Sequence, residues 1–128
     1  MKLNHDCVRS VLLAIEDTEF EDSITIDYLK NKLNDFSEEE IIYTCLKLHE
    51  ANYIEAITVP RLKSHLPGIN RILQITWDGH QFLDTIRDNE VWSTTKTVLS
   101  KVSSASLTFA SSVASQVLTN MISKSMGF

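Results

Sequence analysis

The spacing of the cysteine and histidine residues makes metal binding the first function to consider. Cys45 and His49 are four residues apart in one predicted helix, and His5 and Cys7 are two apart in another. Zinc needs about four ligands in a tetrahedral arrangement. Side chains two positions apart on a helix diverge by about 200°, so His5 and Cys7 cannot both face one ion. Cys45 also lies on an apolar stripe, where a free cysteine acts as a small hydrophobic residue. We therefore expect no metal site.

Acid–base chemistry is the second possibility, because Asp78, His80 and Asp84 lie on one predicted helix. His80 and Asp84 are four residues apart, a spacing that more often gives a hydrogen-bonded surface pair than a catalytic one. The chain has no nucleophile elbow, phosphate-binding loop or paired zinc motif. We expect no enzymatic activity and no cofactor.

Nucleic-acid binding is the third possibility, and it begins with the predicted helix over 37–51. Its expected outward residues include Tyr43, Thr44 and Lys47, which are types that contact phosphates or base edges. The segment 37–50 carries four glutamates and one lysine, however, and carboxylates are repelled by a phosphate backbone. Glutamates at positions 38–40 also complement the positive end of the helix dipole.

A basic turn favours nucleic acid more clearly. Arg61, Lys63, His65 and Arg71 lie around a predicted hairpin, and no acidic residue occurs between Ala56 and Trp77. Such a hairpin can lie along phosphates or enter a minor groove. A solvated loop kept soluble by its charges explains the same residues equally well. The candidate nucleic-acid-binding residues are Tyr43, Thr44, Lys47, Arg61, Lys63 and Arg71.

The elements that must position these residues follow from caps and periodicity. Asn4 is a predicted N-cap, Ser37 and Glu40 form a capping box, and Asn52 suits a left-handed helix stop. Asp27 and Thr76 are the predicted caps of two further helices. We predict helices at about 4–17, 27–34, 37–51, 76–88 and 90–125, a short β-prone run at 23–26, and a hairpin over 53–75. The predicted buried residues are Ile41, Cys45, Leu48, Ile54, Ile72, Phe82 and Ile86.

This order of elements predicts a mainly α chain with a small β-hairpin. It is the order of a winged helix-turn-helix followed by a long C-terminal helical extension. We place the winged-helix domain at 1–89 and the extension at 90–128.

The extension repeats residue types every four positions, first in Ala110, Ala114 and Leu118 and next in Ser111, Ser115, Thr119 and Ser123, and most of these residues are small. Small residues at this spacing let helices approach closely, and a helix this apolar needs a partner surface in water. It either folds back on its own chain or pairs with a second subunit. The second predicts a homodimer through Phe109, Ala110, Val113, Ala114, Val117 and Met121.

Composition and charge narrow the possible cell compartments and classes of protein. The 128 residues carry a net charge of −5, with 5 Lys/Arg against 13 Asp/Glu in 1–56 and 7 against 4 in 57–128. The segment 102–123 is long and uncharged, but half of it is polar, so we expect no membrane span. Two cysteines give no disulfide framework, and the N-terminus shows no apolar signal segment, so we expect a cytoplasmic protein.

Two segments and one longer pattern resemble known proteins. The segment 45–54 and the step Ile75-Thr76-Trp77-Asp78-Gly79-His80 resemble bacterial winged-helix regulators, in which Gly often replaces Asn52. That step also belongs to a pattern that contains Met1-Lys2-Leu3-Asn4, Asp6-Cys7, Arg9, Phe82-Leu83-Asp84, Ile86-Arg87-Asp88 and Trp92. The whole pattern resembles a domain-of-unknown-function family of short proteins from bacteria and their phages. The resemblance implies a winged helix and a bacterial or prophage origin, and it implies no activity and no functional residues.

Two functions from different classes remain. The first is a winged-helix protein that binds nucleic acid, DNA above all, or acts as a regulator. The second is a protein-interaction or oligomerisation module whose acidic third helix docks a basic partner. Basic hairpin residues on the same side as Glu39, Tyr43 and Lys47 would favour DNA, and a uniformly acidic surface would favour a protein partner.

Overall fold

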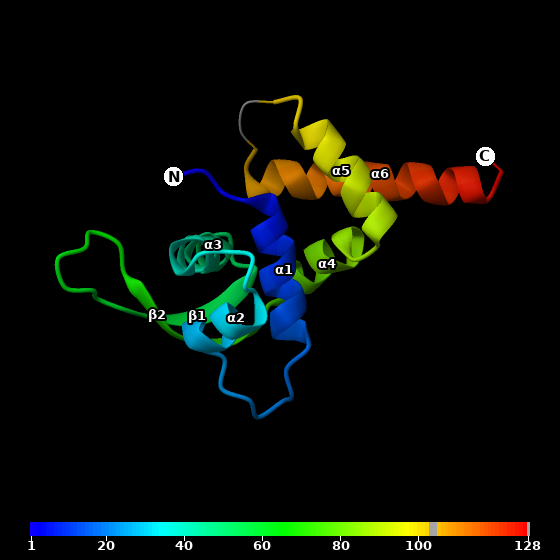
Figure 1. Ribbon diagram of the computed structural model, residues 1–128. Coiled ribbons are helices and arrows are strands. Elements are labelled where there is room, and N and C mark those ends of the chain that lie inside the picture. The colour runs from blue at the N-terminus through cyan, green and yellow to red at the C-terminus, as the bar shows by residue number, and fades with distance from the viewer. Residues whose placement is uncertain (103–104, 128) are drawn as a thin grey trace. The chain divides into compact units, whose positions relative to one another are not determined.

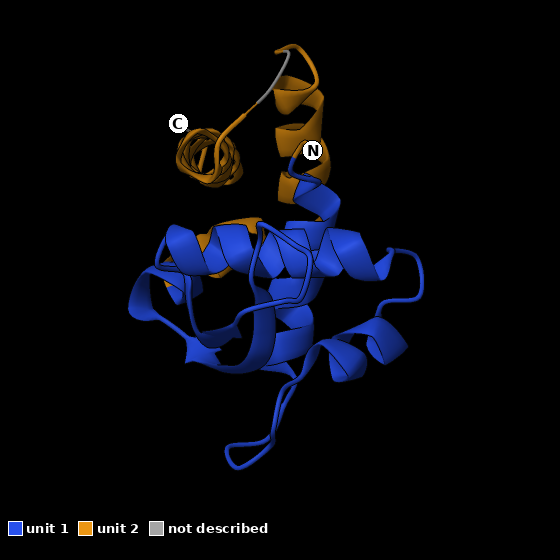
Figure 2. Ribbon diagram, turned by 90° about the vertical axis from the view of Figure 1, so that its left-hand side faces the viewer, with its two compact units in different colours: residues 1, 3–80 blue, residues 2, 81–128 orange. Residues whose placement is uncertain are grey.

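The computed structural model describes residues 1–102 and 105–127, which contain six helices and one two-stranded sheet (Figure 1). The elements in chain order are α1 His5–Glu16, α2 Ile26–Lys32, α3 Glu38–Glu50, β1 Ile54–Val59, β2 Gly68–Ile75, α4 Trp77–Ile86, α5 Asn89–Leu99 and α6 Leu107–Ser125. They fall into two compact units, one of residues 1 and 3–80 and one of residues 2 and 81–128 (Figure 2).

In the first unit, α1, α2 and α3 pack against one another and against the hairpin. The inner faces of these helices carry fully buried aliphatic residues, among them Leu12, Leu29 and Leu48. Burial of each such side chain stabilises the fold by about 1.5–3 kcal/mol. Three helices followed by a two-stranded hairpin after the third is the order of elements that the sequence predicted. All seven residues predicted to be buried are buried.

Two helix starts confirm their predicted caps. Asn4 Oδ1 accepts from Cys7 N at 3.2 Å, and Ser37 Oγ accepts from Glu40 N at 3.1 Å. The Glu40 carboxylate accepts in turn from Ser37 N at 3.4 Å, which completes the capping box.

The predicted cap of α2 was wrong. The N-cap lies two residues before Asp27, at Thr25, whose Oγ1 accepts from Tyr28 N at 3.2 Å, and the helix begins at Ile26. This earlier start puts Ile26 on the helix three residues before Leu29, and both are buried. Because Ile26 is buried when the helix starts there, Thr25 and not Asp27 is the N-cap.

The hairpin is antiparallel, with Ile54 opposite Ile75 and Val59 opposite Gly68. Strand β2 is two residues longer, and register shifts accommodate the difference. Ile72 N donates to Ile24 O at 2.8 Å, so the predicted β-prone run at 23–26 forms a bridge on the other side of β2.

In the second unit, the predicted continuous helix over 90–125 is wrong, because the structure has two helices there. Helix α5 ends at Leu99, and α6 begins after Ser106, whose Oγ accepts from Phe109 N at 3.1 Å. Serine favours caps over helix interiors, and Ser106 takes this role at the start of α6. The predicted helix also crossed residues 103 and 104, which lie outside the described residues. None of the helices in 1–102 and 105–127 combines the length and hydropathy that crossing a bilayer requires.

Candidate nucleic-acid interface

The base of the hairpin is held by the start of α4. Thr76 N donates to Tyr53 O at 3.0 Å, and Thr76 Oγ1 donates to Asn52 O at 2.5 Å. The same hydroxyl accepts from Gly79 N at 3.1 Å, which confirms Thr76 as the predicted cap. Asn52 has φ 64°, the left-handed conformation that the sequence predicted for the end of α3. These contacts join α3, the hairpin and α4, so the hairpin is anchored at its base.

Gly79 is required at this junction. A Cβ on Gly79 would collide with the carbonyl oxygen of Tyr53 and would lie 2.7 Å from Ile75 Cγ2. Only glycine lets the first turn of α4 come this close to the chain between α3 and β1.

The outward surface of α3 contains Tyr43 and Lys47, both partly exposed. Lys47 Nζ forms an ion pair with Glu50 Oε2 at 3.0 Å and lies 5.5 Å from the centre of the Tyr43 ring. The hydrogen bond to Glu50 raises the pKa of Lys47. Because Glu50 already neutralises Lys47, a phosphate would have to compete with an existing partner for this lysine.

Thr44 was expected to face outward, and this was wrong. Its side chain is buried, with 1% exposed, and it hydrogen-bonds the Cys7 thiol on α1. Ile41, Thr44, Cys45 and Leu48 form one inward stripe at helical spacing. The spacing of Thr44 along the helix already indicated a place in that stripe. The prediction put Thr44 at the surface because threonine is polar. Thr44 therefore cannot contact nucleic acid.

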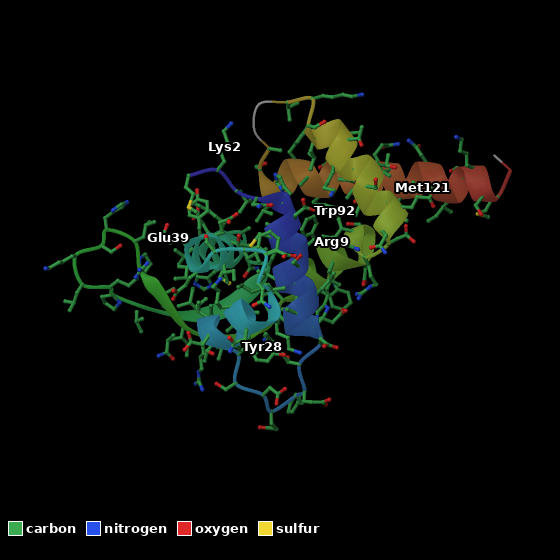
Figure 3. The ribbon with its side chains drawn as sticks, viewed as in Figure 1. Lys2, Arg9, Tyr28, Glu39, Trp92 and Met121 are labelled. Atoms are coloured by element: carbon green, nitrogen blue, oxygen red, sulfur yellow. The ribbon has the colours of Figure 1, made fainter. Side chains whose placement is uncertain are left out.

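The rest of the outward surface of α3 is acidic. Glu38, Glu39 and Glu50 are exposed, and Glu39 is labelled in Figure 3. Glu40 accepts a hydrogen bond from Asn4 Nδ2 at 3.1 Å, and this bond, followed by those from Ser37, lowers its pKa. A helix with this charge distribution is a poor fit to the phosphate-lined major groove.

The hairpin carries the opposite charge. Arg61, Lys63 and Arg71 are all exposed, and within the described chain none of them forms an ion pair. Leu62, between the first two, is 97% exposed. The stem of Arg61 passes over Gly68, where a Cβ would lie 3.1 Å from both Cγ and Cδ of Arg61.

Two hollows connect the hairpin with α3. One, of about 240 Å³, has Glu39, Tyr43 and Leu46 on α3 and Arg61 and Leu66 on the hairpin. The other, of about 370 Å³, has Tyr43, Leu46 and Lys47 on α3 and Leu66 on the hairpin. Arg61 thus lies on the same surface as Glu39 and Tyr43. This surface is mixed in charge, with acidic residues along the helix and basic residues along the hairpin.

The predicted dimer residues on α6 separate into two groups. Ala110, Ala114 and Val117 are buried in the single chain, where α6 packs against α5, so they are not available as a dimer surface. Phe109 remains 42% exposed, whereas Val113 and Met121 are half-buried. Met121 is labelled on α6 in Figure 3 and lines a cleft of about 670 Å³ together with Val98 of α5 and other residues. The sequence periodicity correctly predicted the apolar stripe. Because the helix is interrupted after Leu99, α6 packs this stripe against α5 of the same chain.

The predicted absence of a metal site stays a prediction. Among residues 1–102 and 105–127, no three His, Cys, Asp or Glu side chains are grouped so that they could hold an ion. Cys7 and Cys45 are both buried, and burial raises the pKa of Cys45 to about 12 and raises that of Cys7.

Comparison with known proteins gives a family and one relative. Residues 2–106 match the family described as "Hypothetical protein (DUF2513)". A Haemophilus influenzae protein described as "Uncharacterized protein" is 36% identical over 124 residues, which cover 95% of this chain and 99% of the relative. No solved structure matches the chain.

Proposed function

The chain belongs to the DUF2513 family, and for this member we propose duplex DNA binding in which the hairpin, and not α3, supplies the main contacts. One observation carries the proposal: the exposed tip Arg61-Leu62-Lys63 presents two cations that form no ion pair within the described residues. Cations that have no protein partner can release counterions from phosphates without first breaking an internal bond.

The charges of α3 support this division of roles. Lys47 is neutralised by Glu50, and Glu38 and Glu39 place negative charge on the outward surface. A helix inserted into the major groove would bring these carboxylates close to phosphates. A hairpin tip that lies on the duplex does not require α3 to enter a groove, and Arg61 and Lys63 then face the backbone charge.

Salt titration tests the proposal with two double variants of equal charge change. The first is Arg61→Ala with Lys63→Ala, and the control is Lys101→Ala with Lys124→Ala, two exposed lysines of the second unit. Each phosphate contact contributes about 0.9 to the slope of log affinity against log salt, so the hairpin variant should lose about 1.8. Between about 50 and about 200 mM salt, the wild type should lose about tenfold more affinity than this variant.

The control should keep the wild-type slope. Equal slopes for wild type and hairpin variant would remove the hairpin from the interface. An absence of wild-type binding to a duplex at about 50 mM salt would refute DNA binding altogether.

A protein partner is the second candidate function, favoured by the apolar and acidic residues that line the hollows beside α3. Tyr43, Leu46 and Leu66 line both hollows, and Glu39 lines one and Glu50 the other. A basic segment with an apolar anchor fits this surface. Changing Glu38 and Glu39 to Gln distinguishes the two functions: DNA affinity should rise if DNA binds, and a basic partner should be lost if a protein binds.

We also propose homodimerisation, through a surface that shares Phe109 with the predicted one but is otherwise different. Phe109 and Ile122 of α6 and Met126, the residue after its end, are 42%, 50% and 64% exposed, which leaves apolar area open to a second copy. A bacterial relative supports a bacterial setting for such a regulator, and a prophage origin remains part of the proposal.

A further inference from the structure

We propose that the hairpin tip is a minor-groove wedge: Leu62 enters between two adjacent base pairs and partly unstacks them, while Arg61 and Lys63 hold the flanking backbone. This inference rests on the proposed DNA binding and adds how the tip meets the duplex. Proteins that bend DNA from the minor groove insert apolar side chains between base steps in this manner.

The first support is the position of Leu62 at the apex of a closed turn. Ser64 N donates to Arg61 O at 3.4 Å, and Leu66 N donates to Ser64 Oγ at 3.3 Å. Leu62 and Lys63 are therefore the two central residues of the turn. Leu62 is 97% exposed, so its whole side chain is available to a ligand.

The second support is the stiffness of the segment that carries the tip. The two prolines of the chain, Pro60 and Pro67, stand on either side of it. Each fixes its own φ, so the tip has less conformational freedom to lose on binding. The stem of Arg61 also rests over Gly68, where a Cβ would be tight. A wedge must resist being pushed aside, and these restraints provide that resistance.

The third support is the charge beside the leucine. Lys63 adopts φ 60°, a backbone conformation that glycine or asparagine takes more readily, so the turn carries a cation at a position that favours an uncharged residue. Phe20 is 98% exposed, but its neighbours are Glu19, Glu21 and Asp22, which a phosphate backbone repels. Leu62 has cations as its immediate neighbours on both sides.

The experiment uses the full chain and a duplex with 2-aminopurine beside a central TA step. Pyrimidine–purine steps unstack most easily, and 2-aminopurine fluoresces more strongly when it is unstacked. We expect the wild type to raise the fluorescence and Leu62→Ala to abolish the rise. The matched control is Leu73→Ala, which truncates a leucine of β2 that is 48% exposed and outside the tip. Leu62→Met keeps a long apolar side chain and should restore the signal.

Affinity separates this inference from the function on which it rests. Leu62→Ala should keep the wild-type salt slope, because both cations remain. Its affinity should change by less than about tenfold, because the lost burial is offset by the unstacking that is no longer required.

Tight, salt-dependent binding with no rise in fluorescence would refute the wedge and leave DNA binding intact. A rise that survives Leu62→Ala would also refute it. Failure to bind the duplex would refute both proposals, and Leu62-dependent binding to anionic vesicles in that case would assign the tip to a membrane surface.

Discussion

Gly79→Ala tests whether the junction between α4 and the hairpin holds the first unit together. The added Cβ would overlap Tyr53 O and lie 2.7 Å from Ile75 Cγ2 and 2.9 Å from Tyr53 C. Overpacking typically costs about 1–3 kcal/mol, and a backbone carbonyl cannot rotate away, so the upper end of about 3 kcal/mol applies. Alanine is favoured over glycine in a helix by about 1 kcal/mol. The net loss in the free energy of unfolding should be about 2 kcal/mol.

Urea denaturation followed by circular dichroism measures this loss. With a slope of about 1–3 kcal/mol per M, the midpoint should fall by roughly 1 M. Asp78→Ala is the matched control, because Asp78 is exposed in the same first turn and its Cβ is already present. The control should shift the midpoint much less. If Gly79→Ala is as stable as the wild type or more stable, the close approach of α4 to Tyr53 is refuted.

Four further predictions concern single features of the fold. Because burial raises the pKa of Cys45 to about 12, its thiol should resist alkylation near neutral pH in the native protein and react once urea unfolds it; equal rates would contradict the burial. Hydrogen bonds from Asn4 and Ser37 lower the pKa of Glu40 below its ordinary 4.5, so the ionised carboxylate stabilises the fold above that pH and loses this effect as the pH falls through the lowered folded value. The stability difference between wild type and Glu40→Gln, measured by urea midpoints, should therefore be present near pH 7 and shrink toward about pH 3; a difference that does not change with pH would contradict this. Asn52 has φ 64°, so Asn52→Gly should be neutral or stabilising by up to about 1 kcal/mol and Asn52→Val should be destabilising; the reverse order would contradict the left-handed turn. Sedimentation should show a dimer that Ile122→Asp dissociates, whereas a wild-type monomer throughout the micromolar range would refute dimerisation through α6.

Local signals predicted most of the element boundaries in the first unit. Asn4, Ser37 with Glu40, Asn52 and Thr76 act through hydrogen bonds or backbone angles within a few residues of their own positions. Such effects depend on short stretches of sequence, which is why they are predictable from it.

Tertiary packing decided the points that local signals could not. Thr44 is polar and was expected at the surface, yet α1 supplies a hydrogen-bond partner in Cys7 and the side chain is buried. Thr25 replaces Asp27 as the cap of α2, because burying Ile26 requires an earlier start. In each case the outcome depends on a neighbour or an environment that the local sequence does not specify.

In the candidate site, too, some features follow from the sequence alone and others from the tertiary structure. The sequence by itself determined that the hairpin is basic, that the third helix is acidic, and that the last helix carries an apolar stripe, because charge and periodicity are properties of the residues themselves. Only the tertiary structure decided that Thr44 is buried, that Arg61 shares a surface with Glu39, and that Ala110 and Ala114 are buried within the chain. Whether a charge or an apolar surface is available depends on what else lies within a few ångströms of it, and the fold sets those distances.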